Sequence, residues 1–118
     1  RWRKMFGGGM RQSGILAAAG IYALENNVQR MEEDHRRALS IAQAIDEMDH
    51  VSVDLNAVQT NMVYFSANNH SASEVSERMA KAGIDMFDIS PTHCRIVTHL
   101  HITDEDVKNV IEALSSLN

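Results

Sequence analysis

A stripe of apolar residues most constrains how this 118-residue chain can fold. Its members are spaced alternately by four and three residues: Leu24, Val28, Met31, His35, Ala38, Ala42 and Ile45. This spacing places them on one face of an α-helix, with charged residues on the opposite face. Because a single helix over 13–48 would be about 54 Å long at about 1.5 Å per residue, we expect a bend near Asn26 and Asn27. The small alanines suit packing on a sheet, and we interpret His35 as a core histidine rather than a ligand.

Residues 15–24 form an apolar, alanine-rich run, which predicts a helix buried on most sides. Residues 49–118 instead alternate between strand and helix patterns. Strands are expected at 51–55, 61–65, 84–89 and 95–100. One helix begins at a capping box formed by Ser71 and Glu74 and ends at Gly83, and another begins at Thr103. The order predicts an α/β chain in which a long connecting helix over 13–48 leads into a small α+β domain over 49–118, with a β-β-α-β-β-α layer.

Charge is distributed unevenly along the chain. Residues 1–12 contain four basic residues and no acid, whereas 13–118 contain seven basic and all 16 acidic residues. A chain this acidic is a poor candidate for nucleic-acid binding, and no apolar run reaches membrane-spanning length. Since Trp2 and Phe6 look like packing residues and the chain starts with Arg1, we expect the chain to be a piece of a longer protein whose missing N-terminal part supplies the surface on which 1–12 packs.

Three glycines, at 7–9, lie between Lys4 and Arg11. Glycine allows a positive φ and a close approach of the backbone, and backbone amides before a helix can hold an anion. Two readings remain open: an anion site in which Lys4 and Arg11 bind phosphate or carboxylate, and a flexible joint with solvated basic residues. No GK[ST] follows the glycines, so the segment is not a Walker loop.

Arg95 is the second candidate binding residue. It is expected to open a strand and to face the same way as Val97 and His99, where its planar fork could hold a carboxylate through two hydrogen bonds. The alternative is an ordinary ion pair between a strand-end arginine and a surface acid. His99 and His101 are expected to share a strand face, but neither a zinc-finger spacing nor an HExxH helix accompanies them or His93, so we expect no metal site. We expect no nucleophile at Cys94, because the sequence offers it neither a loop–helix elbow nor an orienting third group. The single cysteine excludes an intrachain disulfide and fits a reducing, cytoplasmic compartment.

Three runs carry a resemblance to a known family. Residues 1–20 (RWRKMFGGGMRQSGILAAAG) closely resemble the segment that follows the cofactor lysine in low-specificity L-threonine aldolases. Residues 59–63 (QTNMV) and 95–100 (RIVTHL) resemble that family's small-domain motifs, in the same order. The resemblance covers essentially the whole chain. It implies the C-terminal third of a fold-type I enzyme, aspartate-aminotransferase-like, that uses pyridoxal 5′-phosphate (PLP). It also implies that 1–12 is an active-site segment belonging to a missing large domain.

The resemblance also implies roles for individual residues. The family cleaves β-hydroxy-α-amino acids such as L-threonine and L-allo-threonine to glycine and an aldehyde, using PLP as an electron sink. Arg95 matches the arginine for the substrate α-carboxylate. Lys4 and Arg11 match basic positions near the cofactor, which are expected to reach its phosphate in a neighbouring subunit of a homo-oligomer, a dimer or tetramer.

The lysine that holds the cofactor covalently lies upstream of Arg1 in the family. Neither Lys4, Lys81 nor Lys108 stands in its motif, so no catalytic residue is assigned here and we expect the chain alone to be inactive. A second hypothesis from a different class is a free-standing α+β module that senses an amino acid or mediates dimerisation.

Overall fold

The computed structural model describes residues 1–117, which form two compact units divided after Arg30. The first unit contains helix α1 (Trp2–Met5) and helix α2 (Gly14–Asn26). All of α2 is exposed, so the prediction of a helix buried on most sides is wrong for the chain by itself. The reason is that the first unit offers only a short helix and a loop, and these leave every side of α2 uncovered.

The glycine segment folds back tightly on α1. Gly7 has a φ of 81°, and the Gly8 amide donates to the Arg3 carbonyl at 2.7 Å. A Cβ at Gly8 would lie 2.8 Å from that carbonyl oxygen, closer than a side chain allows. The rings of Trp2 and Phe6 stack with centroids 6.2 Å apart. The segment is therefore a defined turn whose backbone path requires glycine at both positions.

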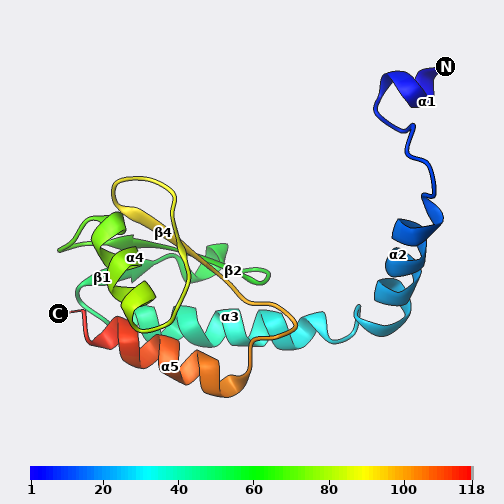
Figure 1. The fold of residues 1–118 in the computed structure, drawn as a ribbon. Coiled ribbons are helices and arrows are strands. Elements are labelled where there is room, and N and C mark those ends of the chain that lie inside the picture. The colour runs from blue at the N-terminus through cyan, green and yellow to red at the C-terminus, as the bar shows by residue number, and fades with distance from the viewer. Residues whose placement is uncertain (118) are drawn as a thin grey trace. The chain divides into compact units, whose positions relative to one another are not determined.

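The second unit begins with helix α3 (Met31–Asp46), drawn in cyan in Figure 1. Residues 27–30 form a turn between α2 and α3, which confirms the expected break near Asn26 and Asn27. The buried face of α3 comprises Asp34, Ala38, Ile41, Ala42 and Ile45. His35 is exposed, so its interpretation as a core residue is wrong: the face is completed by Asp34 and Ile41, and His35 lies outside it.

A four-stranded antiparallel sheet follows, with the order β1-β2-β4-β3. The strands are β1 (Val51–Val53), β2 (Met62–Ala67), β3 (Phe87–Asp88) and β4 (His93–Val97); a 3-10 turn, η1 (Leu55–Ala57), follows β1. With α4 (Ala72–Lys81) after β2 and α5 (Asp104–Ser115) after β4, the predicted β-β-α-β-β-α order is confirmed (Figure 1).

Two strands differ from their expected bounds. β3 is limited to Phe87–Asp88 instead of 84–89, and β4 covers His93–Val97 instead of 95–100. β4 ends just before Thr98, whose hydroxyl donates a hydrogen bond to the Asp34 carbonyl on α3 at 2.7 Å. Arg95 therefore lies in the middle of its strand and does not open it. His99 and His101 lie after the strand, so they share no strand face.

The core lies on one face of the sheet. Alternate strand residues are buried there, among them Val51, Val63, Phe65, Cys94 and Ile96. Helices α3, α4 and α5 supply the other half of this core. The opposite face, which we call the open face, carries the outward residues of the same strands: Ser52, Met62, Tyr64, Ser66, Phe87, His93, Arg95 and Val97. Such alternation is typical of an antiparallel sheet covered on one side only.

The helix starts follow the predicted signals. Ser71 and Glu74 form a complete capping box at α4, and Thr103 and Asp106 form another at α5. Each box satisfies backbone N–H groups that a helix cannot pair internally. The hydrogen bonds from Thr103 also hold the pKa of the Asp106 carboxyl below its ordinary value.

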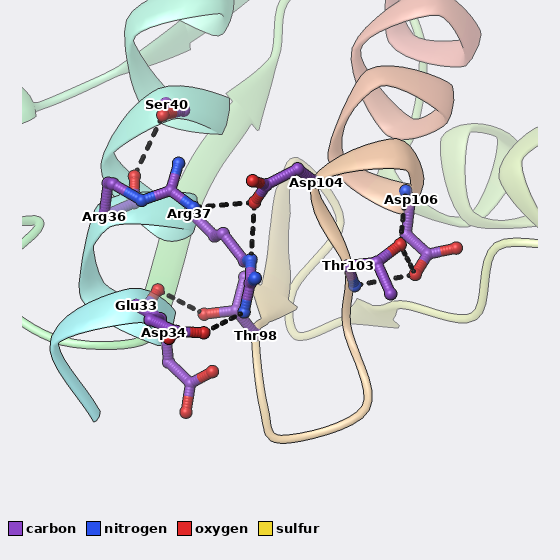
Figure 2. Close-up of polar contacts among 9 residues, drawn as sticks. All are labelled: Glu33, Asp34, Arg36, Arg37, Ser40, Thr98, Thr103, Asp104 and Asp106. Carbon is purple, nitrogen blue, oxygen red and sulfur yellow. Dashed lines mark hydrogen bonds and ion pairs between the residues drawn. The ribbon is translucent and has the colours of Figure 1, made fainter. Parts of the chain in front are cut away.

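Polar contacts hold α3 to the start of α5, as Figure 2 shows. The Asp104 carboxylate accepts hydrogen bonds from Arg36 at 2.7 Å and from Arg37 at 2.8 Å. Arg37 also pairs with Glu33 at 3.3 Å. The Arg37 hydrogen bond, followed by that of Arg36, lowers the pKa of Asp104. These contacts, together with the Thr98 hydroxyl, fix the chain that leaves β4 and so help to define the strand that carries Arg95.

Candidate functional site

Arg95 lies on the open face between two aromatic residues. In the sheet register it is directly opposite Tyr64 on β2 and Phe87 on β3. Its guanidinium carbon lies 4.9 Å from the centroid of the Phe87 ring. This is cation–π geometry. The Tyr64 hydroxyl donates instead to the Met62 sulfur at 3.8 Å. Of the two aromatic neighbours, Phe87 therefore contacts the guanidinium through its ring, whereas the Tyr64 hydroxyl bonds to another side chain.

The Arg95 side chain lacks polar partners in the described part of the chain. Its Nε atom is shielded from solvent and has no hydrogen-bond partner among residues 1–117. No carboxylate within those residues forms an ion pair with it. A shielded donor without a partner costs about 1–3 kcal/mol. The alternative of a strand-end ion pair therefore finds no support in residues 1–117, and a carboxylate site at Arg95 stays a prediction.

Lys4 and Arg11 both belong to the first unit, and both are exposed. Lys4 lies on α1, just before the turn at Gly7 and Gly8, and Arg11 lies in the turn that precedes α2. Neither side chain makes an ion pair or a hydrogen bond within residues 1–117. A phosphate site formed by Lys4 and Arg11 stays a prediction.

The histidines near β4 have local partners. His93 Nδ1 lies 3.1 Å from the Ser90 hydroxyl and 3.0 Å from the Thr92 hydroxyl. The rings of His99 and His101 contact each other edge to face at 5.8 Å. Across the described residues 1–117, no three His, Cys, Asp or Glu side chains are grouped so that they could hold a metal ion.

Cys94 faces the core, directly beside Arg95 in sequence but on the opposite side of the sheet. Its thiol donates to the Ala72 carbonyl at 3.7 Å. Burial, aided by the charge of Asp88, raises the pKa of this thiol to about 11. The thiolate is the reactive form, so the structure gives Cys94 a packing role.

We expect Cys94 to resist alkylation. At pH 8 the thiolate fraction of a group with a pKa of about 11 is on the order of one in a thousand. Iodoacetamide should therefore modify the folded protein far more slowly than the urea-unfolded protein, as measured by mass spectrometry. Equal rates for the folded and unfolded forms would contradict this assignment.

Sequence reasoning did not identify Phe87 as part of the site. The signal was present as an aromatic residue in an expected strand, but the contact depends on the register between β3 and β4. That register is set by tertiary packing, which the sequence pattern of a two-residue strand does not encode.

Within residues 1–117, none of the helices combines the length and apolar character needed to cross a membrane.

Comparison with known proteins extends these observations. Residues 1–68 match the model of the beta-eliminating lyase family. A low specificity L-threonine aldolase of Escherichia coli (strain K12) is 46% identical over 110 residues, which are 93% of this chain and 32% of the relative. A probable low-specificity L-threonine aldolase 2 of Arabidopsis thaliana is 34% identical over 121 residues, covering 99% of this chain and 34% of the relative. The chain thus spans about a third of the length of the curated relatives it matches.

Solved structures of other proteins share the fold described above. A C-DES variant with glycine covalently linked to its PLP cofactor has a TM-score of 0.70 at 16% identity, over 90% of this chain and 29% of that one. The L-threonine-O-3-phosphate decarboxylase of Porphyromonas gingivalis has a TM-score of 0.62 at 16% identity, over 76% of this chain and 27% of that one. The resemblance to L-threonine aldolases that the three sequence runs suggested is confirmed by the curated relatives. Because the family model matches more than half of its residues, the chain belongs to the beta-eliminating lyase family.

Proposed function

We propose that this chain is the C-terminal part of a PLP-dependent aldolase, which cleaves L-threonine or L-allo-threonine to glycine and an aldehyde. The observation that carries the proposal is the Arg95 guanidinium on the open face, which lies over the Phe87 ring at 4.9 Å from its centroid and has no acidic partner in residues 1–117. The curated relatives named threonine aldolases support the reaction.

Arg95 is proposed to bind the α-carboxylate of the substrate. Because its Nε atom is shielded, the terminal Nη groups are the part of the fork that can hold the carboxylate. Two hydrogen bonds to one planar group fix the rotation of the amino acid about Cα, and so select which Cα bond is cleaved. PLP, when bound, supplies the electron sink for this cleavage.

Lys4 and Arg11 are proposed to bind the cofactor phosphate. Their charges and the backbone of the turn at Gly7 and Gly8 suit a phosphate dianion. We also propose a homo-oligomer, a dimer or tetramer, in which these residues reach a neighbouring subunit's site, and a cytoplasmic location, to which the buried reduced Cys94 is suited.

The reaction is tested with the whole protein. Purified protein supplied with PLP is expected to release acetaldehyde from L-threonine, measured by coupling to alcohol dehydrogenase and NADH. Removal of PLP should abolish the release, and its return should restore it. Binding of L-threonine without any aldehyde would contradict the aldolase and favour the alternative, a small module that senses an amino acid.

The cofactor role makes a separate prediction. The double variant Lys4→Ala, Arg11→Ala should retain less PLP after dialysis, because it loses charge-assisted hydrogen bonds to the phosphate. If a phosphate bridges two subunits, the variant should also assemble less well without cofactor, and excess PLP should partly restore the oligomer. Titration of the apo protein with PLP, followed by size-exclusion chromatography, measures both effects. Unchanged PLP affinity would mean that 1–12 is only a solvated joint.

A further inference from the structure

We propose that Phe87 is a positioning residue for Arg95: its ring holds the guanidinium in place while the N–H groups of the fork stay available for the substrate carboxylate. This inference rests on the proposed function of Arg95. Its evidence is the contact between the two side chains, the register of β3 and β4, and the lack of polar partners for Arg95.

The sheet register makes the contact possible. Phe87 and Arg95 are directly opposite each other in the antiparallel pair of β3 and β4, where facing side chains on one side of a sheet come within contact distance. The guanidinium carbon lies 4.9 Å from the ring centroid. Phe87 keeps 61% of its surface exposed, so packing in the core does not explain its position.

The alternative supports for an arginine are missing in the described chain. An arginine is usually held by carboxylates or carbonyls, but Arg95 has no ion pair within residues 1–117 and its Nε atom has no hydrogen-bond partner there. A long side chain without such partners loses rotamer entropy when a ligand orders it. The ring of Phe87 restricts the side chain beforehand and so lowers this cost.

The nature of the contact also leaves the N–H donors of Arg95 free. The Phe87 ring carries no hydrogen-bond acceptor oxygen or nitrogen and attracts the cation through its π-system, whereas a carboxylate binds the N–H groups of the guanidinium. Phe87 can therefore hold the group without competing for the donors that bind a carboxylate. An acidic side chain of the protein in place of the ring would form an ion pair with Arg95 and occupy some of those donors.

The test compares Phe87→Leu with Phe87→Tyr in the whole protein. Leucine keeps an apolar side chain but removes the ring, whereas tyrosine keeps the ring and serves as the matched control. Phe87→Leu should raise the KM for L-threonine about 2- to 5-fold, the effect of one exposed cation–π contact. The Kd of glycine, measured by calorimetry, should rise by a similar factor, while Phe87→Tyr stays close to the parent in both.

The same exchange in an Arg95→Ala background separates positioning from a structural role. If Phe87 acts through Arg95, adding Phe87→Leu to Arg95→Ala should not change the KM for L-threonine or the Kd of glycine any further. The thermal unfolding midpoint of the single variant Phe87→Leu should match that of Phe87→Tyr. An equal loss in both backgrounds, or an equal loss for leucine and tyrosine, would overturn the proposal. A different result would count against the proposed function itself. If Arg95→Ala alone leaves the activity with L-threonine unchanged, Arg95 does not bind the substrate carboxylate, and the proposed function fails whatever Phe87→Leu does.

Discussion

Replacement of Arg95 by alanine is expected to lower kcat/KM for L-threonine by about 30-fold to several thousand-fold. Loss of one partner of a desolvated charge pair costs about 2–5 kcal/mol, and each 1.36 kcal/mol is about one decade in rate. In this case the partner left unpaired would be the substrate carboxylate. Steady-state kinetics of the whole protein with saturating PLP measure the change.

Two controls give this result its meaning. Arg95→Lys should recover little activity, because an ammonium keeps the charge but cannot reproduce the planar fork. Retention of PLP should be nearly unchanged in both variants, since the proposed site is for substrate and excess cofactor should not rescue them. A near-normal kcat/KM in Arg95→Ala would show that the arginine has no part in substrate binding.

Replacement of Phe65 by alanine should have the largest effect on stability. Phe65 is 1% exposed at the centre of β2, where it lies opposite Val53 on one side and Cys94 on the other. Truncation of a buried phenylalanine costs about 3–5 kcal/mol, because it removes apolar contacts and leaves a cavity. Urea unfolding of the 118-residue chain, followed by circular dichroism, measures the loss.

The matched variant is Phe65→Leu, which keeps most of the volume and should cost less than about 1.5 kcal/mol if the core repacks. A loss below about 1 kcal/mol in Phe65→Ala would contradict the core described here. Because Phe65 lies opposite Cys94 within the pair of β2 and β4, Phe65→Ala should also disturb the strand that carries Arg95.

Local signals in the sequence predicted much of the fold. The capping box at Ser71, the helix start at Thr103, the break before α3 and the order of elements after residue 50 follow from short-range chemistry, which acts over three or four residues. The position of Arg95 as a residue of a strand was also predicted correctly. The glycines were expected to form either an anion site or a flexible joint, and only the structure shows a defined turn in which Gly8 approaches Arg3 too closely for a side chain.

Long-range packing decided what the sequence did not. His35 fits the 4-3 spacing, yet Asp34 and Ile41 complete the buried face of α3 and leave His35 exposed. The alanine-rich α2 was expected to be buried, but burial requires neighbours that the first unit lacks. The contact between Phe87 and Arg95 depends on the pairing of a two-residue strand. No pattern within so short a strand could fix its register.

The most direct test of the account compares two substrates in two proteins. L-threonine and L-threoninamide differ only in the α-carboxylate, and both can release acetaldehyde. In the parent protein, kcat/KM should be higher for L-threonine than for L-threoninamide, because the amide cannot form the charged pair with the guanidinium. The ratio should be about the factor by which Arg95→Ala lowers kcat/KM for L-threonine. In Arg95→Ala this preference should fall to about one. If Arg95→Ala keeps the parent's preference for L-threonine over the amide, Arg95 does not bind the α-carboxylate, and the central claim that Arg95 is the substrate-binding residue is wrong.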